Sequence, residues 1–368
     1  MRRVRPAAPQ LAGLEPYDPK YLPAEAFLSA NENPCDVEAA LRAEIVREIR
    51  RTALNRYPDP LANDLRDLIA EANGLDRDWV LMGNGGDELL FDTALAWGGP
   101  GRTFLNLPPT FSVYEANARL TNTPVIDIPR LPDTFAIDEP CVLQAVSDPA
   151  NNITFTIVTS PNNPTGLRAR QEFILQLLDA TDALVMVDEA YFEFSRETMR
   201  PYLEQHENLV ILRTFSKAFS LAGVRIGYIL AHPSVIREYC KVRQPYSVDA
   251  VSQAIACVVF RNRNAFEPAI QQIISERERL LAELRATPGI EPFPSDSNWV
   301  LFRMPGADEA WRHLYDRGIL VRDFSSAALL EGTLRVTVGT PEQNDAFLSA
   351  LRDFVLDKER GGSYGRAE

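Results

Sequence analysis

The stretch LRTFSKAFSLAGVRIGY (residues 212–228) places one lysine, Lys217, among small and apolar residues directly after a strand-like run. The 38 basic residues of the chain include only four lysines, so a lysine in this setting is unusual. Arginine stays protonated in proteins, whereas a lysine beside apolar neighbours can lose its proton and act as a nucleophile. An arbitrary lysine more often lies on the surface at a strand end, so the rest of the sequence has to decide between these interpretations.

Short apolar runs alternate with helix-like segments through most of the chain. They are apolar on both faces, as in strands of a parallel sheet covered by helices, and they span residues 79–83, 154–160, 183–190, 208–215 and 224–231. This alternation predicts an α/β architecture. After residue 250, a long helical pattern (about 251–286), further strand-like runs and a final helix predict a smaller α+β domain.

We therefore predict a chain in three parts. They are an N-terminal arm (1–34), a large domain with a mostly parallel sheet covered by helices (35–250), and a small C-terminal domain (251–368). Part of the N-terminal segment is expected to join the small domain. A chain of 368 residues is long enough for one large and one smaller hydrophobic core.

The composition is that of an ordinary globular protein and argues against several functions. The net charge of −13 disfavours binding to nucleic acid and to anionic membranes, since both require a basic surface. No long apolar run and no signal-peptide pattern occurs, so we expect a cytoplasmic protein. The four cysteines form no CxxC or CxxH pair and the three histidines are scattered, which disfavours a metal site or a disulfide framework.

Polar residues and glycines follow the predicted strands at the points where these strands end. Ligands of an open α/β sheet bind at the carboxyl ends of its strands. Residues from distant parts of the sequence are therefore expected to meet at one edge, namely 83–87, Asn163, Asp188, Tyr191, Ser216 and Lys217. Together these groups could hold an aromatic aldehyde that carries a phosphate.

Taken singly, each of these features also has a simpler interpretation. GNGGDE (83–88) could cradle a phosphate at a helix N-terminus, but glycines also mark ordinary turns. Asp188, at the end of a buried run, needs a cationic partner, which a protonated pyridine or an arginine would supply equally well. Turn chemistry alone explains SPNNPTG around Asn163. Only these features taken together, in this order along the chain, indicate a single kind of site.

In this order and spacing, the motifs SPNNPTG, VDEAYFEF and TFSKAFSLAGVRIGY resemble those of the fold-type I pyridoxal-phosphate aminotransferases of class I/II. Within that group the chain is most similar to the histidinol-phosphate aminotransferases, from LEPYDP and SANENP to LRVTVGT. The resemblance implies a homodimeric enzyme that moves an amino group between a small-molecule amino donor and a 2-oxo acid. Histidinol phosphate, with the 2-oxoglutarate/glutamate pair, is the expected substrate, in histidine biosynthesis.

The resemblance also assigns roles to individual residues. Lys217 is expected to bind pyridoxal 5'-phosphate covalently, as an aldimine, and to move the proton. Asp188 would pair with the pyridine nitrogen, while Asn163 and Tyr191 would bind the phenolic oxygen. The remaining cofactor contacts would come from Gly85, Gly86, Asp87, Ser216 and Arg225 at the phosphate, from Phe111 stacked on the ring, and from Tyr57 of the neighbouring subunit.

Substrate contacts are implied for four residues, Tyr17, Asn33, Arg322 and Arg335. Two arginines suit a phosphate dianion and can also accept the carboxylates of glutamate. Both arginines could instead be polar-face residues of alternating strands.

Three features depart from the histidinol-phosphate subfamily and leave the substrate open. Gly86 stands where serine or alanine is common, and Ser247 and Asp249 stand where asparagines are common. If Asp249 faced the pocket, its negative charge would disfavour a phosphorylated substrate. The segment 323–333 lacks the proline-glycine pair often found between the two arginines.

Four other functions remain alternatives. An aminotransferase for aromatic or other amino acids and a threonine-phosphate decarboxylase would use the same lysine and differ in their products. A pyridoxal-phosphate-sensing regulatory module would carry a DNA-binding domain, for which the roughly 30 residues ahead of the first predicted helix are too few. A plain α/β binding protein would leave Lys217 and Asp188 together at one edge without a purpose.

Overall fold

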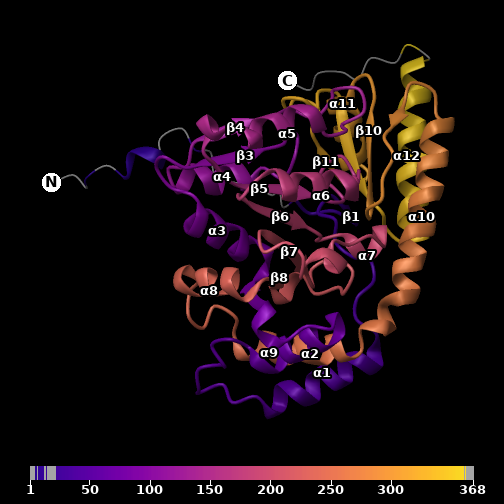
Figure 1. Cartoon of the computed structure of the whole chain (residues 1–368). Coiled ribbons are helices and arrows are strands. Elements are labelled where there is room, and N and C mark those ends of the chain that lie inside the picture. The colour runs from indigo at the N-terminus through magenta and orange to yellow at the C-terminus, as the bar shows by residue number, and fades with distance from the viewer. Residues whose placement is uncertain (1–4, 6, 12–13, 15–21, 360, 362–368) are drawn as a thin grey trace.

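The computed structural model describes residues 5, 7–11, 14, 22–359 and 361, and its centre is a seven-stranded sheet of order β2-β8-β7-β6-β5-β3-β4 (Figure 1). β8 is antiparallel to both neighbours, and the other adjacent strands are parallel. Each of the five predicted apolar runs overlaps one of these strands, which confirms the α/β architecture. The strands are β2 (Val80–Asn84), β3 (Thr103–Asn106), β4 (Val125–Asp127), β5 (Ile153–Thr159), β6 (Leu184–Asp188), β7 (Leu209–Thr214) and β8 (Ile226–Ala231).

Both faces of this sheet are buried beneath helices. In β6, Val185 and Val187 pack into the core on one face, and Leu184 and Met186 pack into the core on the other. Burial of each such side chain contributes about 1.5–3 kcal/mol to the stability of the fold. This packing fixes the positions of the strand ends. One face is covered by α3 (Gly85–Trp97), α4 (Val113–Leu120) and α8 (Pro233–Val242), and the other by α2 (Asn63–Asn73), α5 (Glu139–Ser147) and α6 (Gln171–Ala180).

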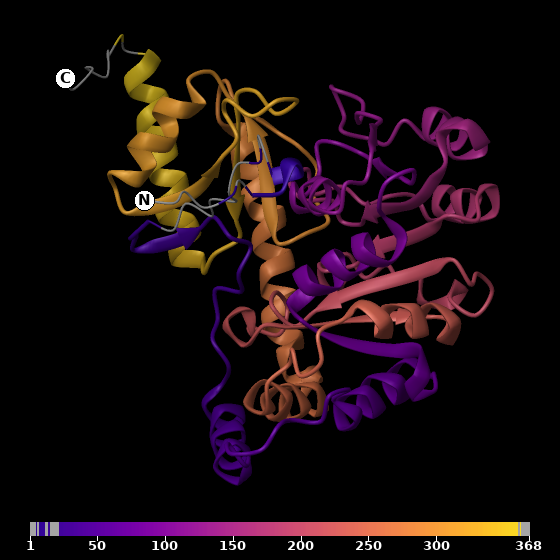
Figure 2. The same ribbon diagram turned by 90° about the vertical axis from the view of Figure 1, so that its left-hand side faces the viewer.

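A second, five-stranded sheet has the order β1-β11-β12-β10-β9. Its first strand comes from the N-terminal segment and pairs in parallel with β11, so part of the expected arm is an edge strand of this sheet. Helices α10 and α12 lie side by side against the sheet (Figures 1 and 2). The elements are β1 (Ala26–Leu28), β9 (Glu291–Pro292), β10 (Trp299–Arg303), β11 (Ile319–Asp323), β12 (Thr333–Thr337), α10 (Glu267–Ala286), α11 (Ala307–Tyr315) and α12 (Pro341–Glu359). The domain boundaries given above stay a prediction.

The helical pattern predicted as continuous over about 251–286 is divided in two, so that prediction was wrong. Helix α9 (Ala250–Arg261) ends before a short 3₁₀ turn (Arg263–Phe266), and α10 begins at Glu267. Pro268 lies in the first turn of α10. Proline is tolerated there, whereas inside a continuous helix it would remove a hydrogen bond and clash with the preceding turn.

At the far end of the large sheet, α1 (Ala39–Arg51) and α2 pack against α9 (Figure 1). The short helix α7 (Phe192–Ser195) follows β6 and contacts α10. In the described part of the chain, no helix is both long and apolar enough to cross a membrane.

Candidate active site

A cavity of about 780 Å³ opens between the carboxyl ends of the large-sheet strands, residues 29–32 and the β11–β12 region. This volume suits a cofactor together with a small substrate. The structure brings most of the predicted site residues together here. Those that line the cavity are Gly86, Asp87, Phe111, Asn163, Asp188, Tyr191, Ser216, Lys217, Arg225, Arg322 and Arg335.

Two predicted residues are placed elsewhere, and a third is not described. Tyr57 is 82% exposed and stacks on Tyr246, with ring centroids 4.6 Å apart, away from the cavity of its own chain. Asn33 does not line the cavity, and its side chain is bound to main-chain groups: Nδ2 donates to the oxygen of Ala218 (3.1 Å), and Oδ1 accepts from the N–H of Cys35 (3.0 Å). Tyr17 lies outside the described residues.

The segment GNGGDE, expected to cradle a phosphate, lies where β2 passes directly into α3. Gly85 adopts a positive φ of +74°, and a Cβ there would lie 2.4 Å from Nη2 of Arg225. The Arg225 guanidinium donates to Asp87 Oδ2 (3.0 Å) and to Ser216 Oγ (3.4 Å). The first N–H groups of α3 and this guanidinium therefore converge on one spot, which is a favourable place for an anion.

Lys217 follows β7 and reaches into the cavity. Its Nζ donates to the main-chain oxygen of Ala30 at 2.9 Å. Burial lowers the pKa of Lys217 to about 8, and the nearby charge of Arg335 acts in the same direction. Because an amine with this pKa is partly neutral near pH 7.5, Lys217 can act as a nucleophile and as a base.

Asp188 ends β6 on the floor of the cavity and is 5% exposed. Its Oδ2 accepts from the Tyr114 hydroxyl (2.6 Å), and its Oδ1 accepts from the N–H of Ala190 (3.0 Å). Burial raises the pKa of Asp188 to about 6, while these two hydrogen bonds act in the opposite direction. Both donors are neutral, so a cation placed beside this buried carboxylate would be strongly favoured.

Sequence reasoning missed Tyr114. This tyrosine lies in the first turn of α4, three residues after Phe111, and the two rings meet edge to face with centroids 5.6 Å apart. Its hydroxyl also lies 2.8 Å from Oγ1 of Thr159. The sequence offered one signal for Tyr114: it follows Phe111 by three residues near a helix start, a spacing that turns both rings toward the same side.

Asn163 and Tyr191 lie on the wall nearest the five-stranded sheet. The Arg335 guanidinium donates to Oδ1 of Asn163, which leaves the amide nitrogen of Asn163 as the donor end of that side chain. Oη of Tyr191 accepts from Nδ2 of Asn31 at 3.2 Å. Asn31, two residues before the predicted Asn33, was also missed, because nothing in the motif SANENP distinguishes its asparagines.

Arg322 and Arg335 are direct partners in the antiparallel pairing of β11 with β12. Like charges placed opposite each other destabilise a sheet, so an anion between them would be favoured. Arg335 is held in place, since Nη2 donates to the main-chain oxygen of Ser29 (2.6 Å).

Asp249 does not face the cavity. It is the N-cap of α9, where its carboxylate accepts from the N–H groups of Val251 and Ser252, both at 2.9 Å. Its charge is therefore used at a helix start. Asp249 is therefore not expected to repel a phosphorylated substrate in the cavity.

The residues present fit a pyridoxal phosphate. They offer an amine with a lowered pKa, a buried carboxylate for a protonated ring nitrogen, and a helix start with an arginine for a phosphate. Together, the fold and this donor set define an enzyme class that handles an aromatic aldehyde phosphate at the edge of a mixed sheet.

Comparison with known proteins gives the family. The chain matches the model of aminotransferase class I and II over residues 26–351 and belongs to this family of pyridoxal-phosphate-dependent enzymes. It is 39% identical over 356 residues to histidinol-phosphate aminotransferase 1 of Carboxydothermus hydrogenoformans, covering 96% of this chain and 100% of that protein.

Two solved structures share the fold. Histidinol-phosphate aminotransferase from Sinorhizobium meliloti, in complex with pyridoxal-5'-phosphate, superposes with a TM-score of 0.86 at 22% identity, covering 97% of this chain and 99% of that one. L-threonine-O-3-phosphate decarboxylase from Porphyromonas gingivalis gives a TM-score of 0.79 at 27% identity, covering 90% and 99%. The family and the fold predicted from the sequence are thus confirmed.

Proposed function

We propose that this aminotransferase acts on histidinol phosphate, with 2-oxoglutarate and glutamate as its partner pair, in histidine biosynthesis. The observation that carries the proposal is the register of Arg322 and Arg335, which are paired across β11 and β12 and both line the cavity. Two adjacent guanidinium groups suit a phosphate dianion better than a single carboxylate. The relative from Carboxydothermus hydrogenoformans supports the same substrate.

Three sets of residues would hold the ring, the phosphate and the phenolic oxygen of the cofactor. Phe111 would stack on the ring, and the start of α3 would bind the phosphate together with Ser216 and Arg225. Asn163 and Tyr191 would donate to the phenolic oxygen. When bound, pyridoxal phosphate supplies an electron sink for the electron pair that remains after the substrate loses its α-proton.

Lys217 and Asp188 carry out the chemistry of the chain itself. Nζ of Lys217 would be the point of attachment for the cofactor and, once released as a free amine, would serve as the base that takes and gives back the substrate α-proton. The main-chain oxygen of Ala30 is placed to hold this amine while it is released. The Asp188 carboxylate would pair with the ring nitrogen and favour its protonated form.

A homodimer completes the proposed site. Tyr57 and its stacking partner Tyr246 lie outside the cavity of their own chain, and Leu54 nearby is 78% exposed. A second copy covering this surface would bury these side chains and would bring Tyr57 toward the phosphate of its partner. We further propose the cytoplasm as the location of the enzyme.

The phosphate site proposed at the start of α3 can be tested by substituting two neighbouring glycines. Gly85→Ala is expected to weaken cofactor affinity by about tenfold or more, because a Cβ would displace Arg225 and a positive φ costs an alanine roughly 1–2 kcal/mol. Gly86→Ser is the matched control, since its Cβ would meet a Leu212 side-chain carbon at an ordinary 3.6 Å. The measurement is cofactor binding by absorbance. Equal affinity in the two variants would contradict a phosphate site at the start of α3.

The substrate can be tested by a visible absorption titration of the cofactor-loaded protein. L-histidinol phosphate is expected to convert the cofactor band to its aminated form at low concentration, while phenylalanine and threonine phosphate are not. Product analysis separates the alternatives, since an aminotransferase gives a keto compound plus glutamate and a decarboxylase releases carbon dioxide. A response only to another amine would overturn the substrate and leave the family intact.

A further inference from the structure

Asn31 is buried where the N-terminal segment passes between the two sheets. It is 1% exposed, and its backbone takes the left-handed conformation (φ +56°), which asparagine tolerates better than most residues. Its N–H donates to Oγ1 of Thr337 (3.0 Å), and its main-chain oxygen accepts from Nδ2 of Asn298 (3.0 Å). Thr337 ends β12 and Asn298 precedes β10, so Asn31 is fixed to the five-stranded sheet.

Thr337 decides which way round the Asn31 amide lies. The threonine oxygen accepts from the main-chain N–H of Asn31, so its single hydroxyl proton is available for Oδ1 of Asn31, at 3.3 Å. Oδ1 therefore faces Thr337, and Nδ2 faces Oη of Tyr191 at 3.2 Å. The amide accepts on the side of the small sheet and donates on the side of the large one.

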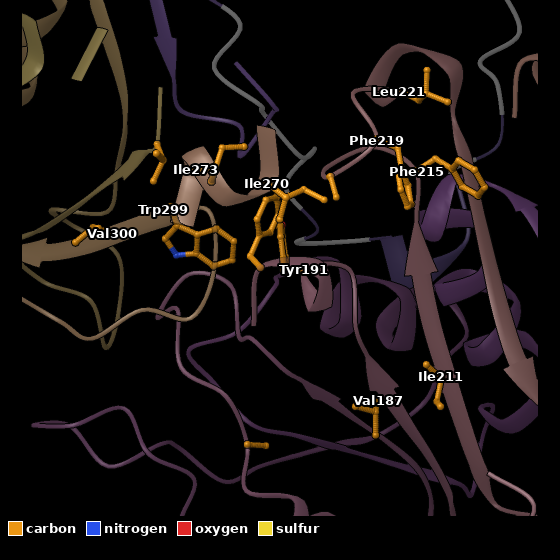
Figure 3. Packing of buried hydrophobic residues seen from close by; sticks show 14 of the residues in the cluster. Val187, Tyr191, Ile211, Phe215, Phe219, Leu221, Ile270, Ile273, Trp299 and Val300 are labelled. Atoms are coloured by element: carbon orange, nitrogen blue, oxygen red, sulfur yellow. The ribbon is translucent and has the colours of Figure 1, made fainter. Parts of the chain in front are cut away.

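Tyr191 is held in a fixed orientation beside Trp299. The two rings meet edge to face with centroids 4.5 Å apart (Figure 3), and Nε1 of Trp299 is anchored on the main-chain oxygen of Pro164 (2.8 Å). Because Oη of Tyr191 accepts from Asn31, the phenol has to place its own proton on a different acceptor. Tyr191 lines the cavity, where it would meet a bound cofactor.

We propose that Asn31 is a positioning residue, which by donating to Tyr191 makes this phenol donate in turn to the phenolic oxygen of bound pyridoxal phosphate. The inference rests on the proposed function, which assigns Tyr191 to that oxygen. A donor at this oxygen stabilises its negative charge, and the nitrogen of Lys217 attached nearby becomes less basic. Asn31 thus sets, through Tyr191, how readily that nitrogen loses its proton.

Asn31→Asp inverts the polarity of this contact with little change of shape. Aspartate also tolerates the left-handed backbone, but its carboxylate only accepts, so Tyr191 would turn its proton away from the cofactor. The measurement is the pH midpoint at which the visible band of the resting holoenzyme changes. Asn31→Asp is expected to raise this midpoint by about one pH unit, as for the loss of one hydrogen bond to a charged group.

A double variant separates the hydrogen bond from the added negative charge. If Asn31 acts through the phenol, Asn31→Asp combined with Tyr191→Phe has the same midpoint as Tyr191→Phe alone. A shift of equal size with and without the phenol would show a charge effect and overturn the inference. No variant alters the charged groups around Lys217, which are Arg335, Glu32, Asp87 and Arg225.

The outcomes also distinguish this inference from the proposed function. If Tyr191→Phe moves the midpoint and Asn31→Asp does not, the role of Asn31 is overturned and the proposed function stands. If the wild-type protein shows no visible band, or Tyr191→Phe leaves the midpoint in place, the assignment of Tyr191 fails and the inference fails with it.

Thr337→Val keeps the test decisive should Asn31→Asp fail to fold. It removes the hydroxyl that orients the amide and retains a strand-forming side chain. A smaller upward shift of the midpoint is expected, and no shift would count against the inference.

Discussion

Replacing Lys217 with alanine is expected to lower turnover by at least about 10⁴-fold, since the general base alone contributes about 10²–10⁴ and the variant also loses the nucleophile that attaches the cofactor. The fold should persist, because the variant loses the hydrogen bond from Nζ to the main-chain oxygen of Ala30 but also buries one charge less. The measurements are kcat at saturating substrate and cofactor, and the thermal midpoint of unfolding.

Two further variants make this result specific. Lys217→Arg keeps the positive charge but cannot deprotonate, so its loss of turnover should match that of Lys217→Ala. Lys241 is the matched control, because it lies exposed on α8 beside Glu238 (2.6 Å). Lys241→Ala should leave turnover unchanged. Normal turnover in Lys217→Ala would remove this residue from the mechanism.

The lowered pKa of Lys217 also predicts a pH dependence. Only the neutral amine attacks an aldehyde, and its fraction rises tenfold per pH unit below the pKa. The rate of cofactor attachment to the cofactor-free protein should therefore rise up to about pH 8 and level off above it. A rate that kept rising toward 10.5, the ordinary lysine value, would show that burial and Arg335 do not act on this amine.

The sequence predicts well the features that repeat along the chain. Strands β5, β6 and β7 are uninterrupted apolar runs, so their existence and the site residues at their ends could be placed before the structure was known. Strands β3 and β4 were missed because both are short, spanning only Thr103–Asn106 and Val125–Asp127. The division of α9 from α10 could have been inferred from Pro268.

The sequence could not tell which polar residues face the cavity. Asp249 and Asn33 stand close in the sequence to groups that line or flank the site, yet both are used by neighbouring backbone groups. Tyr114 and Asn31 reach Asp188 and Tyr191 only because α4 and the N-terminal segment lie against the end of β6 and the turn after it. Such contacts depend on tertiary packing over long sequence separations, which no local pattern encodes.

Replacing Asp188 with asparagine is expected to lower kcat by about 10²–10³-fold, the range for losing one preorganised electrostatic group, with a smaller effect on KM. The asparagine oxygen can still accept from the N–H of Ala190, and its amide nitrogen can donate to the Tyr114 oxygen, whose own proton can go to Oγ1 of Thr159, so the site should keep its shape. Its neutral amide does not favour a protonated ring nitrogen, and a neutral ring accepts electrons poorly. Single-turnover rates and the ¹⁵N NMR shift of a labelled ring nitrogen measure the two effects, and an unchanged kcat would exclude this role.

Tyr114→Phe refines the same prediction, because it keeps the carboxylate and removes one donor to it. A hydrogen bond from Tyr114 favours the ionised form, so its loss should raise the pKa of Asp188 further above its present value of about 6. The reaction needs the ionised carboxylate, which becomes protonated as the pH falls through this pKa. The acidic limb of the kcat profile should therefore move to higher pH, with kcat nearly normal on the alkaline side. An acidic limb that stayed in place would mean that Tyr114 only fills space beneath the ring, whereas a shifted limb would show that this phenol keeps Asp188 ionised at the pH where the enzyme works.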